Sequence, residues 1–474
     1  MSLERPPLDP TLLGPTPPFG TGWDRGGERM RLSAPEEPGP SRAGAVVFTL
    51  CCCFLAFVGG AYVVLDRLPP YGLLKDAYSA GTALYDRTVH YKNPLQTDLW
   101  ADARSDQRGV TVPDAGKAFP GFTLYSSGHD AAAYLIDMNG RVVHQWRLPY
   151  SQVWDSSSVV EKPRPDNFVA FDKVHLFPNG DILAVYSGVG DTPWGLGLVK
   201  MTKDSKVIWK YLDRVHHDVE VGADGRIYTL THRFRDRPVD TMPQLDRPML
   251  EDFLVILSPD GQVEQKISLL DAMGASPYRK FLAALSDYGR QDPLHANAAK
   301  PIDEKPAKAP DAWQAGDVLL SFREASLLAV LDPRQGRFVW AARGPWLGQH
   351  DPSLLPNGHL LMFDNLGSIG PLGSSRLLEI NPADMAITWE YDGAQGHPLE
   401  SVLRSNAQRL PNGNSLITES DGGRLVEVTP QGEIAWEYMN PVRGGTADRR
   451  VPIVTGGERF TADEVGAWLT SQPQ

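Results

Sequence analysis

Two kinds of tight turn alternate along the chain, and this alternation is the feature that most restricts its fold. The first kind precedes a short strand pattern that ends in Trp; its copies end at Trp146, Trp209, Trp340, Trp389 and Trp436, with a sixth copy, Asp260-Gly261-Gln262-Val263, that lacks the Trp. Trp340 and Trp389 are 49 residues apart, and Trp389 and Trp436 are 47 apart. That spacing is typical of a four-stranded propeller blade.

The second kind of turn is an Asn-Gly or Asp-Gly pair, a strong signal for a β-hairpin. It occurs at Asn179, Asp224, Asn357 and Asn412, with a degenerate copy at residues 315–320. Each four-stranded sheet contains two or three hairpins, so both kinds of turn are expected in every blade. The sequence predicts an all-β fold, a six-bladed β-propeller over residues 118–445. The repeated Trp side chains are expected at contacts between blades.

A partly helical insertion is expected at residues 268–313, between the third and fourth copies of the repeat. Insertions in propellers lie on one face, which is often the functional face.

A single apolar segment, Ala43–Leu65, predicts a transmembrane helix. Its 23 residues carry no charge, and at about 1.5 Å per residue they span about 30 Å of hydrocarbon. A cleaved signal peptide is the main alternative, but its apolar part is usually about 7–15 residues and follows a short basic start. Four Arg residues precede the segment at 25, 29, 31 and 42, against Arg67 and Lys75 after it. This bias predicts a single-pass protein of the inner (cytoplasmic) membrane with its C-terminal domain periplasmic or extracellular.

The segments outside the propeller have their own composition. Residues 1–42 are rich in Pro and Gly and predict a disordered cytoplasmic tail. Residues 66–117 are interpreted as a juxtamembrane stalk that contains an amphipathic helix within 71–90. Residues 446–474 form a C-terminal tail that can include a helix. All three cysteines, Cys51 to Cys53, lie in the apolar segment, so the exported body has no disulfide.

The net charge of −12 removes the electrostatic basis for binding a phosphate backbone, and no nucleic-acid partner is expected.

Histidines recur at one position of the repeat. The residue seven before the Asn/Asp-Gly turn is His217 in one copy and His350 in another, and Asp172 and Ser405 in two more; His295 precedes the degenerate copy. This register predicts that His217, His295 and His350 converge at one end of the propeller axis. A single His at such a position is more often a turn-capping residue, but three in register favour a site.

Arg323 ends the strand that follows His295, and its guanidinium can face the same end of the axis. The alternative is an ion pair with Glu324. Arg offers fixed paired donors, and His offers a donor or a nucleophilic nitrogen near neutral pH. Together they can hold a tetrahedral oxyanion.

No metal or cofactor is expected. The Asp-Gly turns lack the acidic loop of a calcium site. Three imidazoles around an axis could also hold zinc in a metal hydrolase, but the separations of 78 and 55 residues between them match no local zinc motif.

An ordered series of short motifs extends through about 320 residues. It comprises Pro120–Tyr125, Ala133–Trp146, His216-His217-Asp218, Leu294–Asn297, Leu319–Arg323, Gly348–Asp351, Phe363–Asn365 and Pro411–Asn414. With these motifs the chain resembles the bacterial aryl-sulfate sulfotransferase family, whose members work without the nucleotide sulfate donor. The family's fold is a six-bladed propeller. Its best-known members are soluble periplasmic enzymes with an additional N-terminal β domain, in place of which this chain has the predicted helix and stalk.

The resemblance implies an enzyme with four catalytic residues. His350 would be the nucleophile that becomes sulfurylated, and Arg323 would clamp the sulfuryl oxygens. His217 and His295 would stabilise charge and exchange a proton with the phenol; the turn register favours His217 over its neighbour His216. The implied substrates are an aryl sulfate donor and a phenol acceptor. The alternative is a non-catalytic, membrane-tethered propeller that binds a protein partner, since fold does not fix function.

Overall fold

The computed structural model describes residues 41–66, 68–74, 77–78, 90–190, 194–286, 289–306 and 308–469. The chain forms two units, residues 1–79 and 80–474. The predicted disordered tail lies almost wholly outside the described residues, as does most of the predicted stalk helix.

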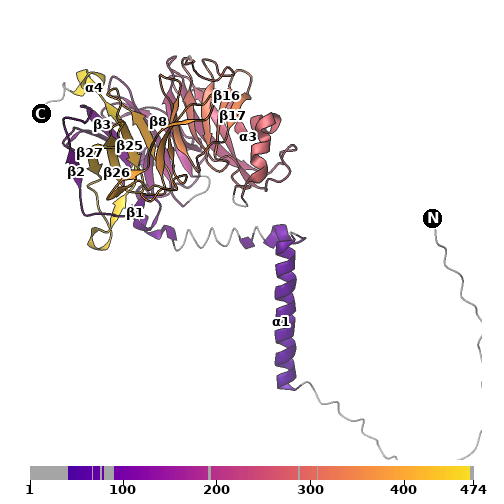
Figure 1. Ribbon diagram of the computed structural model, residues 1–474. Helices are drawn as coiled ribbons and strands as arrows, with labels where there is room; N and C mark the ends of the chain where they lie inside the picture. Colours follow the sequence, from indigo (N-terminus) through magenta and orange to yellow (C-terminus); the bar gives the residue numbers. More distant parts are fainter. Residues whose placement is uncertain are drawn as a thin grey trace, which may run out of the picture. The chain divides into compact units, whose positions relative to one another are not determined.

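The first unit contains one long helix, α1 (Arg42–Leu65), drawn in indigo in Figure 1. The Ser41 side chain caps its start by accepting a hydrogen bond from the backbone N–H of Gly44 at 3.1 Å. An 18-residue window of the helix has a mean hydropathy of 2.3, and none of its side chains is buried. The helix is therefore long and apolar enough to cross a membrane.

The second unit is a six-bladed β-propeller, as predicted (Figure 1). The first blade consists of β29 (Val454–Phe460), β3 (Phe122–Ser127), β4 (Ala132–Ile136) and β5 (Val142–Arg147). The second consists of β6 (Val169–Leu176), β7 (Ile182–Gly188), β8 (Gly195–Met201) and β9 (Val207–Tyr211). The third consists of β10 (Val215–Val221), β11 (Ile227–Arg235), β12 (Met249–Leu257) and β13 (Val263–Ser268).

The remaining blades follow the same antiparallel order. The fourth consists of β14 (Ala296–Pro301), β15 (Val318–Phe322), β16 (Leu327–Asp332) and β17 (Arg337–Ala342). The fifth consists of β18 (His350–Leu354), β19 (Leu360–Asp364), β20 (Arg376–Ile380) and β21 (Ile387–Tyr391). The sixth consists of β24 (Asn406–Arg409), β25 (Ser415–Glu419), β26 (Arg424–Val428) and β27 (Ile434–Met439), with β2 (Gly109–Pro113) added at its outer edge.

The ring is closed by a strand from the C-terminal segment. Strand β29 pairs with β3 along its whole length, so the first blade combines strands from both ends of the unit. Strand β1 (Trp100–Asp102) likewise pairs with β28 (Arg450–Pro452). Both β29 and β2 lie outside the range 118–445 that the repeats indicate, because neither carries the turn-and-Trp pattern.

The repeated Trp side chains join neighbouring blades. Four indole N–H groups donate to a backbone carbonyl in a hairpin turn of the next blade, at 2.9–3.1 Å: Trp146 to Gly180, Trp209 to Pro259, Trp389 to Pro430, and Trp436 to Met138. The last of these links the sixth blade to the first. The expected contacts between blades are thus present, with a hydrogen bond added to the apolar burial.

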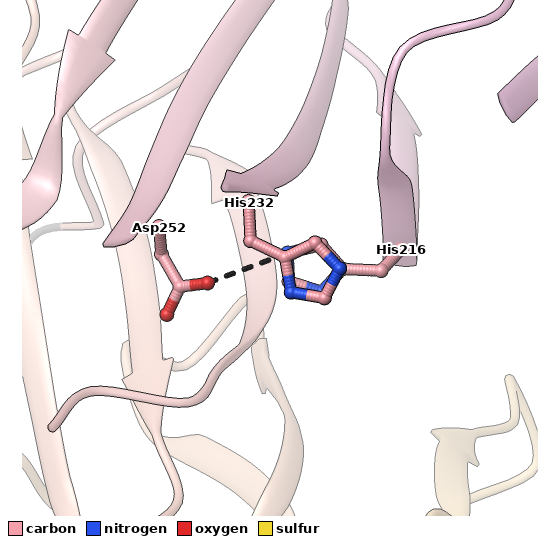
Figure 2. Close-up of side chains that lie close together, drawn as sticks. All are labelled: His216, His232 and Asp252. Carbon is pink, nitrogen blue, oxygen red and sulfur yellow. Dashed lines mark ion pairs between the residues drawn. The ribbon is translucent and has the colours of Figure 1, made fainter. Parts of the chain in front are cut away.

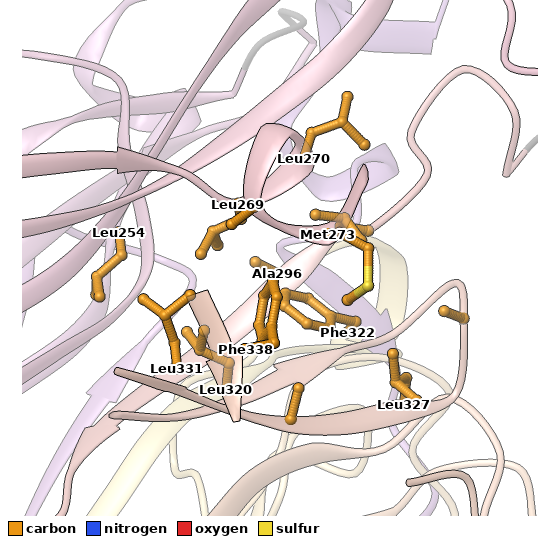
Figure 3. Packing of buried hydrophobic residues seen from close by; sticks show 14 of the residues in the cluster. Leu254, Leu269, Leu270, Met273, Ala296, Leu320, Phe322, Leu327, Leu331 and Phe338 are labelled. Atoms are coloured by element: carbon orange, nitrogen blue, oxygen red, sulfur yellow. The ribbon is translucent and has the colours of Figure 1, made fainter. Parts of the chain in front are cut away.

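The insertion contains α3 (Leu269–Ala275) and a 3₁₀ segment, η5 (Pro277–Ala284), and ends before β14. It is shorter than the predicted range of 268–313, because residues 296–301 form the inner strand of the fourth blade. Leu269, Leu270 and Met273 are buried against the third and fourth blades, where Figure 3 shows them beside Phe322 and Phe338. The C-terminal helix α4 (Ala462–Leu469) packs in the same way, with Val465 and Trp468 in the core cluster that contains Trp146.

Candidate active site

The innermost strand of each blade lines the propeller axis: β29, β6, β10, β14, β18 and β24. Five of these six strands carry a register shift against their neighbour, near Thr455, Phe171, His216, Ala296 and His350. A bulge bends a strand and redirects its side chains. The unusual backbone continues at His217 and His295, whose φ angles are 60° and 47°. The repeated bulge explains why residues in one sequence register gather at one end of the axis.

A cavity of about 620 Å³ at this end is lined by all four predicted site residues, His217, His295, Arg323 and His350. The ring centroids of His217 and His295 are 5.2 Å apart, and those of His217 and His350 are 6.5 Å apart. Side chains that are more than 50 residues apart in the sequence therefore share one small volume.

His350 is held by two acceptors on one ring nitrogen. Its Nδ1 lies 2.7 Å from Oδ1 of Asn365 and 3.1 Å from the carbonyl oxygen of Gly348. The Asn365 amide nitrogen donates to the carbonyl oxygens of Ser401 and Arg404, which fixes its oxygen toward His350. Nδ1 must therefore carry the proton, and Nε2 keeps the lone pair. Burial lowers the pKa of His350 to about 3, so its ring is neutral.

His295 has the opposite charge state. Its Nδ1 lies 2.5 Å from Oδ2 of Asp292, at the end of the insertion. Burial opposes a charge on His295, but the Asp292 carboxylate outweighs it and raises the pKa above its ordinary value. Trp194 stacks on the ring with a centroid distance of 5.1 Å. This end of the cavity therefore carries an imidazolium beside an aromatic surface.

His217 also lines the cavity, with its Nδ1 2.7 Å from Nδ1 of the buried His216. Burial and the neighbouring His216 lower the pKa of His217 well below its ordinary value. His216 lies behind it, with Nε2 3.5 Å from Oδ1 of Asp252 (Figure 2). The structure thus places His217 at the cavity, as the turn register indicates, and places His216 behind it, in contact with Nδ1 of His217.

Two guanidinium groups reach the same cavity. Arg323 forms an ion pair with Glu324 and also lines the cavity, so both alternatives considered for it apply. Its buried Nε has no hydrogen-bond partner within the described residues. Arg404, from the fifth-to-sixth blade connection, is the second; its Nε is 3.6 Å from Asp172 and its Nη2 3.4 Å from Asp98. The cavity is therefore suited to an anion.

A larger cavity, of about 740 Å³, lies at the other end of the axis, since five of the six inner strands begin at or near the first cavity and run toward the second. Its lysines, Lys173 and Lys300, are paired with the carboxylates of Asp218, Glu220 and Asp351. Three carboxylates outnumber the two lysines in this cluster, whereas Arg323 of the smaller cavity has a buried Nε without a hydrogen-bond partner within the described residues. The larger cavity is therefore less suited to an anion than the smaller one, despite its size.

Within the described residues, two groups of side chains bring metal-ligand atoms within 4.8 Å of one another. Asp218, Glu220 and Asp351 already bind two ammonium groups, which occupy the place of a cation. His216, His232 and Asp252 are the second group, but the two imidazoles are stacked, with centroids 4.2 Å apart and an angle of 27° between their planes (Figure 2). Lone pairs that lie in nearly parallel planes do not meet at one ion, so the arrangement does not fit a metal.

Several residues that contact the predicted four or His216, or that line the cavity, are not among those four; they include Trp194, Asp252, Asp292, Asn365 and Arg404. Asn365 lies in the quoted motif Phe363-Asp-Asn365, and Asp292 is three residues before His295, so short-range signals existed for both. Trp194, Asp252 and Arg404 have no recurring sequence context. They are brought to the site by the β7–β8 loop of the second blade, by β12 and by the connection between the fifth and sixth blades, respectively.

None of the curated proteins matches the chain significantly. Among solved structures, a protein of unknown function from Bacteroides caccae is 15% identical, with a TM-score of 0.44, covering 71% of this chain and 99% of that one. The virginiamycin B lyase of Staphylococcus aureus is 12% identical, with a TM-score of 0.32, covering 57% and 69%. These similarities are too low to support an inference.

The comparison with family models is more specific. The model described as Arylsulfotransferase (ASST) matches residues 173–441. The match contains four of the six inner strands, the second half of β6, and all four predicted site residues. It covers more than half of the chain, which therefore belongs to the arylsulfotransferase family.

Proposed function

We propose that this arylsulfotransferase moves a sulfuryl group from an aryl sulfate to a phenol through a sulfohistidine at His350. The observation that carries the proposal is the pair of acceptors on Nδ1 of His350, which leaves Nε2 unprotonated in a buried, anion-binding cavity. A neutral imidazole attacks sulfur without first losing a proton.

The first half-reaction forms a bond between Nε2 of His350 and sulfur and breaks the bond between sulfur and the aryl oxygen. The electron pair of that bond leaves with the phenolate, which takes a proton from an imidazole of the site. Arg323 and the charged His295 line the same cavity and would stabilise the negative oxygens in the transition state.

The second half-reaction runs in the opposite direction with a different phenol. The acceptor gives its proton to the site, its oxygen bonds to sulfur, and the Nε2–S bond breaks. The Nδ1 proton of His350 is important here, because a sulfurylated ring that keeps this proton is cationic and leaves readily. Asn365 and Gly348 offer neutral acceptors, which hold this proton without removing it.

We also propose that α1 anchors the protein in the cytoplasmic membrane with the propeller on the periplasmic or extracellular side. The support is the length and apolarity of the helix together with the excess of Arg before it. Protease added to intact spheroplasts should digest the propeller, whereas a tag at residue 1 should be cut only after the membrane is opened. Protection of the propeller in intact spheroplasts would contradict this orientation.

The covalent step is tested with an aryl sulfate added without acceptor. The full chain in detergent should gain one sulfuryl group, located at His350 by peptide mapping under neutral or alkaline conditions that spare the N–S bond. His350→Ala should gain none and lose both half-reactions. His175→Ala, a matched change of an inner-strand imidazole that lines the other cavity, should still gain the group. Turnover by the wild type without any adduct would exclude the sulfohistidine.

A further inference from the structure

We propose that Asp252, His216 and His217 form a proton relay that gives a proton to the departing phenolate in the first half-reaction and takes one back from the acceptor phenol in the second. This inference rests on the proposed sulfohistidine pathway and deepens it. In that pathway the site must donate a proton to the departing phenolate and later accept one from the incoming phenol. The proton therefore needs a group that can change from donor to acceptor while the sulfuryl group stays on His350.

The relay begins with the contact between two histidines. Nδ1 of His217 and Nδ1 of His216 are 2.7 Å apart, so one nitrogen carries a proton and the other accepts it. The proton on this contact decides what Nε2 of His217 presents to the cavity. If His216 donates, His217 carries its proton on Nε2 and is a donor; if His217 donates, its Nε2 is a lone pair and an acceptor.

Asp252 allows both arrangements. Its Oδ2 accepts the backbone N–H of Ala296 at 2.8 Å, while its Oδ1 lies 3.5 Å from Nε2 of His216. His216 and Asp252 are 1% and 3% exposed. Nε2 of His216 has no hydrogen-bond partner within the described residues, so the buried Asp252 carboxylate acts through its charge. It favours a proton on Nε2 of His216 in both arrangements and compensates the charge when Nδ1 is protonated as well. Figure 2 marks the ion pair between Asp252 and His216 with a dashed line.

His232 supports the relay without joining it. Its ring is stacked on His216, and the backbone N–H of Gly195 points to its Nε2 at 3.4 Å. Burial, followed by the neighbouring His216, lowers the pKa of His232 well below its ordinary value. The ring therefore stays neutral and does not compete for the proton of the relay.

The proton balance is complete over one cycle. The proposed cycle starts with a proton on each ring nitrogen of His216, one facing Asp252 and one facing Nδ1 of His217. When the phenolate leaves, it takes the Nε2 proton of His217, and the Nδ1 proton of His216 moves to Nδ1 of His217. His216 is then neutral, and the lone pair on Nε2 of His217 takes the proton of the acceptor phenol. The Nδ1 proton of His217 then returns to Nδ1 of His216, and no proton is exchanged with solvent.

The test compares two donors that differ in their need for protonation. Phenyl sulfate releases a basic phenolate, and 4-nitrophenyl sulfate a far weaker base. Asp252→Asn keeps an acceptor for the Ala296 N–H but cannot compensate an imidazolium at His216. It should lower kcat/KM for phenyl sulfate by about 10²- to 10⁴-fold, the usual contribution of a positioned acid or base. The loss with 4-nitrophenyl sulfate should be less than about tenfold.

The matched control is Asp218→Asn, because Asp218 also is a buried carboxylate that accepts a backbone N–H of β14, from Ala299 at 2.9 Å. It should affect the two donors equally. His216→Gln is the second relay variant, since its amide can bind His217 but cannot carry a proton, and it should repeat the donor-dependent loss. If neither relay variant folds, a solvent isotope effect of the wild type that is larger with phenyl sulfate than with 4-nitrophenyl sulfate supports the relay, and equal effects overturn it.

Three other outcomes also overturn the relay. Equal losses with both donors in Asp252→Asn would mean that Asp252 has only a structural role, while the sulfohistidine pathway would stand. One equivalent of bound metal in the wild type, lost together with activity on chelation, would mean that His216, His232 and Asp252 form a metal site. No transfer from either donor by the wild type would overturn the proposed function and the relay with it.

Discussion

Oδ1 of Asn365 lies 2.7 Å from Nδ1 of His350, and the amide nitrogen of the same Asn365 side chain is held by the carbonyl oxygens of Ser401 and Arg404. The second pair of contacts prevents the amide from turning its nitrogen toward the imidazole. A neutral side chain thus sets which nitrogen of His350 is nucleophilic. The fifth blade and its connection to the sixth thus orient Asn365, and Asn365 in turn determines that Nε2 of His350 is the reacting atom.

The first prediction concerns the charge of the side chain at position 365, which contacts Nδ1 of His350. Asn365→Asp places a carboxylate at Nδ1, which favours the protonated ring and raises the pKa of His350 from its low value of about 3. The wild type should show no loss of donor kcat/KM from His350 protonation between pH 5 and 8. The variant should be slower at the acid end of this range and recover as the pH rises. A flat profile in the variant would contradict the proposed role of Asn365.

The second prediction concerns Asp292, which raises the pKa of His295. The raised pKa keeps the imidazolium charged as the pH increases, and the charge is lost as the pH passes through that pKa. Asp292→Asn removes the main stabilising partner, so the decline in kcat/KM should begin at lower pH than in the wild type. Asp311→Asn, at an exposed position between β14 and β15, should leave the profile unchanged.

The third prediction concerns the direct removal of imidazoles. His217→Ala and His295→Ala should each slow both half-reactions by about 10²- to 10⁴-fold, in contrast to the complete loss in His350→Ala. Rapid-quench measurement of phenol release separates the first half-reaction from the second. A near-normal rate in either variant would mean that the substituted histidine has no catalytic role.

The fourth prediction concerns Arg323. Its guanidinium would bind sulfuryl oxygens that carry more charge in the transition state than in the ground state, so Arg323→Ala should lower kcat by about 10²- to 10³-fold. Arg323→Lys should recover only part of the rate, because an ammonium lacks the paired planar donors. A variant that changes only KM would indicate that Arg323 binds the substrate without stabilising the transition state.

The fifth prediction concerns the contacts between blades. Trp146→Phe leaves the carbonyl oxygen of Gly180 without its buried indole donor and should lower the free energy of unfolding by about 1–3 kcal/mol. Trp209→Phe removes the equivalent bond to Pro259 where it is exposed to water, so its effect should be smaller. Urea denaturation of both variants measures the difference, and equal effects would contradict a role for burial.

The sequence alone determined the architecture, because its signals are local. An Asn-Gly pair or a Trp a few residues after a turn specifies a hairpin within one blade, and the repetition of such units specifies the number of blades. The apolar run of α1 is equally local. The register of His217 and His350 could also be read, since a repeated fold places equivalent residues at equivalent points around its axis.

Only the tertiary structure decided how the ring closes and what surrounds each imidazole. Strand β29 pairs with β3, which is more than 300 residues earlier in the sequence, and no repeat pattern at β29 predicts this pairing. Asp252 reaches His216 from β12, and Arg404 reaches the cavity from the connection between the fifth and sixth blades. Burial and neighbouring charge set the ionisation of each histidine. Burial and neighbouring charge both depend on side chains that come together only when the ring is folded, and no short stretch of sequence contains all of them.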